Sequence, residues 1–366
     1  MRPNPAGRDV TDDTMPMNLQ VGILGGGNIS QTHARAALEI DGVKVAAVYG
    51  PNPEKTRRLA DTAGAAAYHE LDAFLAHRPM DAVLIGSPSG LHAEQGIAAA
   101  GHGLHVLVEK PIDITTERAD ALIAACDNAD VKLGVFFQDR TSSDIQKLKK
   151  AIDSGELGKP ILISASVRWY RSPEYYRHSR WRGTWALDGG GALMNQGIHT
   201  IDLLHWLFGD VSSVWARAIT AMHEIEVEDT VVATFDFSNG AVGNFEVATS
   251  AYPGFSRRID MTWSQGTVVL ENDRIRSANL LTPIEGLHGE EPKAVDERVG
   301  SPVVSDTRGH RAIIEDFIRA IVSDGVPLCD GRDARRNVRL VNAIYDSSKS
   351  GLAVSIGSSR VAAERV

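Results

Sequence analysis

The chain has 366 residues, and a single hydrophobic core usually stops growing at about 250–300 residues, so we expect two domains. Hydrophobic residues make up 43% of the chain and charged residues 23%, which excludes a largely disordered chain, a collagen-like fibre and a coiled-coil rod. A net charge of −9 argues against a nucleic-acid partner, and no apolar run reaches the roughly 20 residues that span a bilayer. Cys126 and Cys329 form neither a disulfide framework nor a zinc-ligand set, so we predict no metal site and a cytoplasmic location.

The first 18 residues are polar and lack the apolar stretch of a signal peptide, so they are interpreted as a disordered leader. Short apolar runs then alternate with helical patterns over residues 19–140. Such runs, without in/out alternation, are typical of strands buried on both faces of a parallel sheet. This half is therefore predicted to be a Rossmann-type α/β domain, with strands at 19–24, 43–49, 82–85, 105–108 and 132–137 and helices at 29–40, 53–62, 70–76, 93–100 and 116–128.

Residues 141–366 have a different pattern. An apolar helix is expected at 191–208, and several later runs alternate between apolar and polar residues as half-buried strands do. Asn239-Gly240 between two such runs is a strong hairpin signal. We predict an α+β domain with a large, mostly antiparallel open sheet, with strands at 161–170, 213–223, 230–237, 241–250, 257–263 and 267–270 and further helices at 144–154, 310–323 and 331–350.

A glycine loop joins the first strand to the first helix. It reads G-x-G-x-x-S, with Gly25 for a tight turn, Gly27 for close approach of a pyrophosphate and the small Ser30 for close helix packing. The first helical turn, which includes Asn28 and Ile29, offers free N–H groups to the phosphates. This pattern predicts a dinucleotide cofactor site.

The acidic residue that usually binds the adenosine ribose is absent. Gly50 stands at the end of the second strand, where that residue is expected. Arg57 or Arg58 could pair with a 2′-phosphate, or both could be solvated helix residues. The sequence therefore leaves NAD and NADP open.

Three motifs carry a family resemblance. Residues 85–95 read IGSPSGLHAEQ, residues 105–111 read HVLVEKP, and residues 189–202 read GGGALMNQGIHTID. With the glycine loop, these resemble the glucose–fructose oxidoreductase, inositol dehydrogenase and rhizopine catabolism (Gfo/Idh/MocA) family over residues 19–350. The resemblance implies oxidation of a sugar or polyol hydroxyl, or reduction of the ketone, with a nicotinamide cofactor. It also implies homodimers or homotetramers that form through the C-terminal sheet.

Lys110 follows the strand at 105–108, at the sheet edge where ligands of open α/β sheets bind. Its ammonium could donate to the reacting oxygen, and its pKa should fall through desolvation beside an oxidised nicotinamide. Pro111 restricts Glu109 and Lys110 to extended geometry. The resemblance implies that Lys110 is catalytic and that Glu109 belongs to the cofactor-binding motif.

His199 lies on the expected apolar helix, one turn after Asn195. The resemblance implies that His199 joins Lys110 in proton transfer and substrate binding. The family pattern usually has aspartate at position 195, so we expect Asn195 to hydrogen-bond the imidazole without supplying a charge. Asp202, three residues after His199, could replace that charge or could equally serve helix capping or packing.

The remaining candidates lie in two loops. The resemblance places the loop after the third expected buried strand along the cofactor and implies contacts from Ser87, Pro88, Ser89 and His92, although these residues also suit a turn and a helix start. Residues 168–185 hold six aromatic residues and five arginines, which suit a sugar, a carboxylate or a cofactor phosphate. We expect either a loop over the active site or a subunit contact, with Trp181 and Arg182 on the cofactor and Arg168, Tyr170 and Tyr176 on the substrate.

The predicted function is hydride transfer between NAD(P) and a secondary hydroxyl or ketone of a sugar, sugar derivative or cyclic polyol. One alternative keeps the fold and runs as an NADP-dependent ketosugar reductase. The other is a cofactor-binding sensor without turnover.

Overall fold

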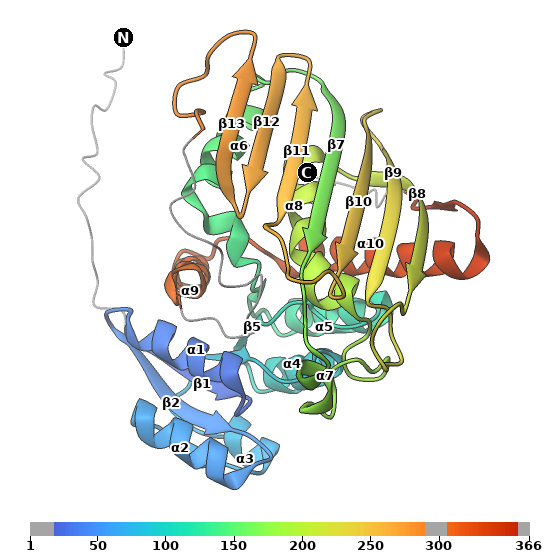
Figure 1. The fold of residues 1–366 in the computed structure, drawn as a ribbon. Coiled ribbons are helices and arrows are strands. Elements are labelled where there is room, and N and C mark those ends of the chain that lie inside the picture. Colours follow the sequence, from blue (N-terminus) through green and yellow to red (C-terminus); the bar gives the residue numbers. More distant parts are fainter. Residues whose placement is uncertain (1–17, 290–305, 358–366) are drawn as a thin grey trace, which may run out of the picture.

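The computed structural model describes residues 18–289 and 306–357 (Figure 1). The leader expected over residues 1–18 lies outside the described residues, apart from Asn18. In the described part, no helix combines the length and the apolar character that crossing a membrane requires.

The N-terminal half is a six-stranded parallel sheet. Its order, β3-β2-β1-β4-β5-β6, changes direction between β1 and β4, and this switch point is where doubly wound sheets bind ligands. The strands are β1 (Leu19–Leu24), β2 (Val43–Tyr49), β3 (Ala66–Tyr68), β4 (Ala82–Ile85), β5 (His105–Val108) and β6 (Leu133–Val135). The helices are α1 (Asn28–Leu38), α2 (Pro53–Ala63), α3 (Leu71–Leu75), α4 (His92–Gly101) and α5 (Thr116–Asn128).

The local sequence explains these boundaries. Asn52 caps α2 by accepting from the Lys55 amide, Pro53 occupies the first helical position, and Gly64 ends the helix in the left-handed conformation. All four residues of β4 are buried, as a strand covered by helices on both faces requires. The Rossmann-type prediction is confirmed.

The second sheet has eight strands in the order β13-β12-β11-β7-β10-β9-β8-β14. β7 and β10 are parallel and the other neighbouring pairs are antiparallel, so the mostly antiparallel prediction is confirmed. The strands are β7 (Pro160–Arg168), β8 (Val211–Ile219), β9 (Thr230–Phe237), β10 (Val242–Ala248), β11 (Arg258–Trp263), β12 (Gly266–Glu271), β13 (Arg274–Leu280) and β14 (Val354–Ser355).

Helices cover one face of this sheet (Figure 1). They are α6 (Ser143–Asp153), α8 (Ile198–Phe208) and α10 (Gly331–Ser350), while the short α7 (Pro173–Arg177) lies in the connection after β7 and α9 (Arg308–Val322) precedes α10. The strict alternation of buried and exposed residues along β9 agrees with one covered and one open face.

Two details differ from the prediction. The expected helix over 191–208 begins as a wider π-helix, Ala192–Gly197, before continuing as α8. The sequence analysis also missed β3, β13, β14 and α7. The hairpin at Asn239-Gly240 is present, and Gly240 has the positive φ of +87° that such a turn needs.

The last two helices return to the N-terminal half. α9 packs on α1, and α10 packs on α5 as well as on β8. The amide of Val135, in the edge strand β6, donates to the carbonyl of Cys329 at 2.9 Å, and Phe317 fills the space beside Gly134. The C-terminal segment therefore covers an edge of the first sheet.

Candidate active site

The glycine loop lies at the switch point between β1 and β4. Gly25 has φ +122°, and a Cβ there would lie 2.8 Å from the Gly86 carbonyl oxygen, so only glycine fits. A Cβ on Gly27 would have no atom within 4 Å, and Gly27 is exposed. A Cβ on Gly86 would lie 3.1 Å from Ser30 Oγ, which shows how closely α1 approaches the end of β4.

This loop fits the phosphates of a dinucleotide. α1 begins at Asn28 with no acidic residue in its first turn, so its free N–H groups and positive dipole end face open space. The sequence predicts pyrophosphate contacts from Gly25, Gly27, Asn28, Ile29 and Ser30, and all five lie in this loop or in the first turn of α1.

The end of β2 carries no carboxylate. Gly50 occupies that position and its carbonyl accepts from His69 Nδ1 at 3.1 Å. A Cβ on the neighbouring Gly26 would lie 3.7 Å from Lys55 Cβ, so a basic residue borders the glycine loop. Arg57 is exposed on α2, and Arg58 pairs with Glu54.

The loop after β4 is tied to the motif after β5. His92 lies within hydrogen-bonding distance of two carbonyl oxygens, that of Ser87 at 2.9 Å and that of Pro111 at 2.7 Å. Burial lowers the pKa of His92, which favours the neutral imidazole. Pro88 and Ser89 lead into a short 3₁₀ helix, Ser89–Leu91, so His92 fixes the shape of this loop.

Lys110 reaches across to the C-terminal half. Its Nζ donates to the backbone oxygen of Asn195 at 2.8 Å, in the π-helix one turn before His199. Burial lowers the pKa of Lys110, and the carboxylates of Glu109 and Asp188 oppose that shift. The Lys110–Pro111 peptide is cis. A lysine held in this way releases its proton more readily than a lysine in water.

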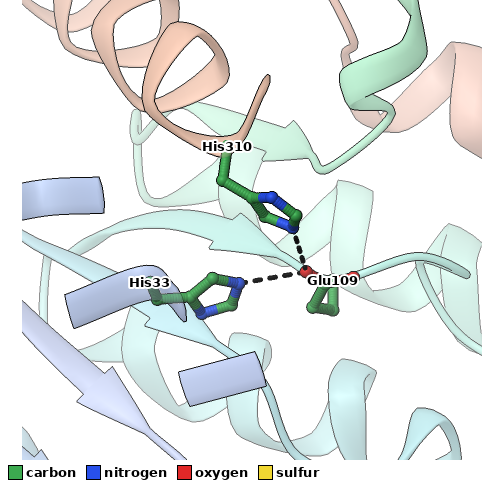
Figure 2. Close-up of side chains that lie close together, drawn as sticks. All are labelled: His33, Glu109 and His310. Carbon is green, nitrogen blue, oxygen red and sulfur yellow. Dashed lines mark hydrogen bonds and ion pairs between the residues drawn. The ribbon is translucent and has the colours of Figure 1, made fainter. Parts of the chain in front are cut away.

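Glu109 is anchored by two buried histidines from different helices (Figure 2). Its Oε1 lies 3.0 Å from His33 Nε2 on α1 and 3.5 Å from His310 Nε2 on α9. Burial alone would raise the pKa of Glu109, but hydrogen bonds from His310 and His33 outweigh it and hold the pKa well below its usual range. The ionised Glu109 therefore links the two halves of the molecule directly beside Lys110.

The same three side chains also have the spacing of metal ligands, since their ligand atoms lie within 4.8 Å of one another. A metal-bound imidazole ordinarily donates its second N–H to an acceptor. His33 Nδ1 is buried and has no hydrogen-bond partner among the described residues. Burial lowers the pKa of His33, and a neutral imidazole that donates from Nε2 accounts for the contact with Glu109. A hydrogen-bonded cluster fits these atoms better than a metal centre.

Asn195 faces a different partner from the one expected. Its Nδ2 donates to Asp188 Oδ1 at 2.8 Å rather than to His199. The other oxygen of Asp188 accepts from the Gly183 amide at 2.9 Å. Burial raises the pKa of Asp188 to about 6. A buried carboxyl group therefore stands beside Asn195.

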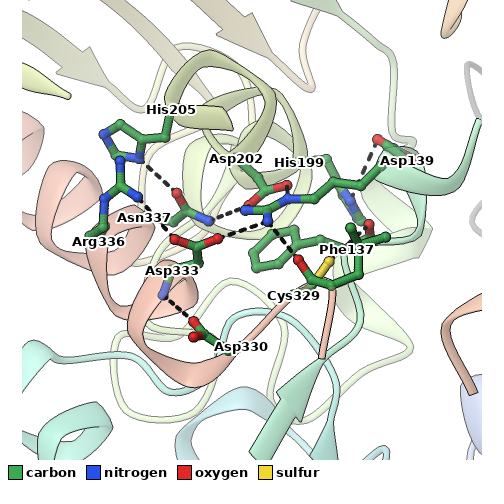
Figure 3. Close-up of polar contacts among 12 residues, drawn as sticks. Phe137, Asp139, His199, Asp202, His205, Cys329, Asp330, Asp333, Arg336 and Asn337 are labelled. Carbon is green, nitrogen blue, oxygen red and sulfur yellow. Dashed lines mark hydrogen bonds and ion pairs between the residues drawn. The ribbon is translucent and has the colours of Figure 1, made fainter. Parts of the chain in front are cut away.

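The carboxylate that faces His199 comes from Asp139 (Figure 3). Asp139 lies in a 3₁₀ helix after β6, Gln138–Thr141, and its Oδ2 is 3.6 Å from His199 Nδ1. The same oxygen accepts from Arg257 Nη1 at 2.7 Å. Phe137 meets the imidazole edge-on, with ring centroids 6.0 Å apart. The negative charge near His199 thus comes from the end of the N-terminal half.

Asp202 does not supply that charge. Both of its oxygens bind the buried Arg140, at 2.6 and 2.8 Å, and Asn337 donates to it as well (Figure 3). Arg140 also donates to Asp333 and to the carbonyl of Leu328. Burial alone would lower the pKa of Arg140, but the carboxylate of Asp202 outweighs it and raises the pKa. Asp202 is part of a structural ion network.

The arginine- and aromatic-rich stretch divides into two regions. Near Lys110, the Arg182 guanidinium lies over the rings of Tyr175, at 4.3 Å, and Trp181, at 5.4 Å. Tyr175 in turn accepts from Gln196 Nε2 at 3.3 Å, beside Asn195. This part of the stretch borders the site.

The other three candidates of the stretch have partners in the sheet domain. Arg168 lies over Phe255, and Tyr170 packs edge-on against Tyr252. The buried Tyr176 hydroxyl lies 2.8 Å from Thr249 Oγ1. A cavity of about 490 Å³ near Trp185 and Tyr345 contains neither Lys110 nor His199.

Sequence reasoning missed Asp139, Asp188 and both histidine partners of Glu109. Asp188 immediately precedes the Gly189–Gly191 run, which is a usable signal. For His310 and Asp139 no local pattern exists, because each meets its partner through chain folding over long sequence distances.

Comparisons with known proteins point in one direction. Residues 19–137 match the GFO_IDH_MocA family, described as an oxidoreductase family with an NAD-binding Rossmann fold, and residues 145–269 match the GFO/IDH/MocA C-terminal domain. The WlbA dehydrogenase from Bordetella pertussis, solved in complex with NADH and UDP-GlcNAcA, is 32% identical. Its alignment has a TM-score of 0.85 and covers 96% of this chain and 100% of that one.

Two curated relatives are more distant. The myo-inositol 2-dehydrogenase of Thermotoga maritima is 28% identical, over 74% of this chain and 80% of its own length. The D-xylose 1-dehydrogenase (NADP(+)) 2 of Haloferax volcanii is 26% identical, over 92% of this chain and 100% of its own.

Proposed function

Because the chain belongs to the Gfo/Idh/MocA family and is an NAD(P)-dependent sugar or polyol oxidoreductase, we propose that Lys110 and His199 carry its proton transfer. The observation that supports this most directly is the hydrogen bond from Lys110 Nζ to the Asn195 carbonyl. This contact brings the catalytic lysine of one half to the helical segment that presents His199. We further propose that residues 19–140 serve the cofactor and that residues from 141 onward serve the substrate.

The bound cofactor supplies the hydride chemistry at its nicotinamide. The chain's own residues bind and orient the cofactor, and they move the proton. In the oxidative direction, neutral Lys110 or His199 accepts the hydroxyl proton while the hydroxyl carbon loses hydride. Burial lowers the pKa of Lys110, so the neutral amine forms more readily than in water.

The substrate class follows from the relatives and from the groups around Lys110. Two relatives are named as dehydrogenases of myo-inositol and of D-xylose, and the WlbA dehydrogenase was solved in complex with UDP-GlcNAcA. Tyr175, Arg182 and Gln196 offer an aromatic face, a guanidinium and an amide, which suit a ring that carries hydroxyl groups. We propose Trp181 and Arg182 as cofactor contacts and Asn195 with His199 as substrate contacts.

We also propose that the open face of the eight-stranded sheet joins two copies of the chain. Leu162, Trp215, Val232 and Val242 lie on strands that are neighbours in this sheet, and each is 46–49% exposed. Exposed apolar side chains gathered on one face are typical of subunit contacts. A Trp215→Glu/Val242→Glu variant should sediment as a smaller species than the wild type, and an unchanged mass would contradict this interface.

A substrate panel tests the function. Purified protein is mixed with NAD or NADP and with polyols, aldoses and sugar acids, and the absorbance of the reduced cofactor is followed. We expect reduction with at least one sugar or polyol. Lys110→Met should abolish it while cofactor binding, measured by calorimetry, is retained. A wild type that binds cofactor and oxidises none of the compounds would instead favour a sensor.

A further inference from the structure

We propose that Asp188 is a positioning residue for proton transfer. It fixes the side chain of Asn195, whose backbone carbonyl accepts a hydrogen bond from Lys110. The carboxylate of Asp188 also sets the protonation state of the lysine. The proposal rests on the proposed function only in that Lys110 is the group that exchanges the proton. The three residues form a chain of contacts. The side-chain amide of Asn195 donates to the Asp188 carboxylate, and the backbone carbonyl of Asn195 accepts from the Lys110 ammonium.

The geometry leaves Asp188 little freedom. Its side chain is 2% exposed, and both carboxylate oxygens are used, one by the Gly183 amide and one by Asn195 Nδ2. The Asn195 backbone is fixed in addition by its own amide, which donates to the Gly191 carbonyl at 3.0 Å. A rigid carboxylate that holds the acceptor of Lys110 controls where the ammonium lies.

The charges that act most strongly on Lys110 belong to Glu109, Asp188, Arg182 and Asp139. Glu109 precedes it in the chain, Asp139 lies in the 3₁₀ helix after β6, and Arg182 and Asp188 come from the segment before the π-helix. The histidines already stabilise the charge of Glu109, and Arg257 pairs with Asp139. Asp188 instead accepts hydrogen bonds from two neutral N–H groups, the Gly183 amide and Asn195 Nδ2, so within the described ranges its charge acts on Lys110 without a paired histidine or arginine.

A nearby negative charge favours the ammonium form of a lysine and so raises its pKa. Burial raises the pKa of Asp188 to about 6, so the carboxylate is present above about pH 6 and is replaced by the neutral acid below it. Loss of this charge should let Lys110 release its proton at lower pH, and the basic form needed for oxidation should then appear earlier in a pH titration.

Asp188→Asn removes the charge and keeps the shape. We expect the limb of the kcat–pH profile that reports Lys110 to move to lower pH, whereas Asp188→Glu should leave it near the wild-type position. The double variant Asp188→Asn/Asn195→Asp exchanges the two side chains and retains one carboxylate and one amide. This exchange should restore a profile close to the wild type. Asn195→Asp alone places two carboxyl groups face to face and should lower kcat by about tenfold or more.

A second measurement does not depend on turnover. In protein labelled with ¹³C-lysine, the Cε signal of Lys110 is assigned with Lys110→Arg and titrated in the wild type and in Asp188→Asn. A lower titration midpoint in the variant supports the proposal even if no substrate is found, in which case the proposed function fails alone. Asp144→Asn is the control, because Asp144 is equally a buried carboxylate that accepts a backbone N–H, from Ile275 at 3.1 Å. A Lys110 midpoint that is the same in wild type and folded Asp188→Asn would overturn the proposal.

Discussion

The polar groups around Arg140 are hydrogen-bonded to one another, whereas some polar groups around Lys110 have no hydrogen-bond partner among the described residues. Every contact of Arg140 described above ends on a carboxylate or a carbonyl, and the network is closed by Asn337 (Figure 3). Around Lys110, Arg182 Nε and Gln196 Oε1 are buried with no hydrogen-bond partner within the described ranges, and the same holds for Ser30 Oγ at the glycine loop. Buried polar atoms are almost always paired, so unpaired ones mark where a ligand is expected. The region of Arg140 is held by internal hydrogen bonds, and we expect the region of Lys110 to bind a ligand.

The largest expected effect separates the two regions by activity. Lys110→Met should lower kcat by about 10²–10⁴-fold, because the positioned proton donor and acceptor is lost. The free energy of unfolding should stay the same or rise, since a partly buried ammonium whose described hydrogen bond is the one to the Asn195 carbonyl is removed. Steady-state kinetics and urea denaturation of the same preparation check both statements. A variant that unfolds more easily than the wild type would show that Lys110 is also structural.

The Arg140 network should respond in the reverse manner. Asp202→Ala leaves a buried guanidinium without its main partner and should cost about 3–5 kcal/mol of unfolding free energy. The kcat of the folded fraction should change little, because both carboxylate oxygens of Asp202 are bound by Arg140. Glu54→Ala breaks the exposed pair with Arg58 and should be nearly neutral in the same urea experiment. If both variants lost the same unfolding free energy, the buried Arg140 network would be no more important for stability than an exposed ion pair, which would contradict this prediction.

Glu109 lies between these extremes, because it is fully paired but adjoins Lys110. Glu109→Gln should cost about 1–3 kcal/mol, because Oε1 contacts both histidines while Oε2 accepts from the Lys110 backbone N–H, so the NH₂ group of Gln must face at least one N–H donor. The pKa of Glu109 is held below its ordinary value of 4.5, so its contribution to stability is present above that pH and is lost as the pH falls through the folded-state pKa. Wild-type protein should therefore lose more stability than the Gln variant on acidification below about pH 4.5. The same substitution at the exposed Glu94 is the control.

The smallest expected effect concerns cofactor choice at the end of β2. Gly50→Asp restores a carboxylate for the ribose hydroxyls and should raise the ratio of kcat/KM for NAD over NADP about tenfold. A Cβ at this position would lie 2.5 Å from Thr56 Oγ1, so a steric effect accompanies the charge. Gly50→Ala isolates that steric effect and should leave the ratio unchanged. If both variants change the ratio equally, charge is not the cause.

The sequence predicts the first half of the fold closely, because buried parallel strands leave uninterrupted apolar runs. β2, β4 and β5 have the predicted boundaries. The missed β3 and β14 are two or three residues long, and β13 has the pattern RIRSANL, with too few apolar residues to stand out. Edge strands of this kind depend on their neighbours more than on their own composition.

The site is predictable only where its residues form a local motif. The glycine loop and Lys110 lie at strand ends that periodicity reveals, and the structure places them at the expected edge of the sheet. The charge near His199 was sought at Asp202, on the same helix, but Arg140 binds that residue. Asp139 takes its place from 60 positions away in the chain, and no spacing rule reports such a contact.

The return of α9 and α10 to the first sheet has a consequence for how the chain is made. A ribosome releases His310 and Cys329 some two hundred residues after β5 and β6 have emerged. Until then the nascent Rossmann half carries an uncovered strand edge and a Glu109 with one of its two histidines. A fragment that ends at residue 140 should for the same reason be a poor dinucleotide binder, although its sequence has every glycine of the fingerprint. The two halves match separate family models, but contacts to Glu109 and to the edge strand β6 come from residues 310–329, which are synthesised long after the strands they meet.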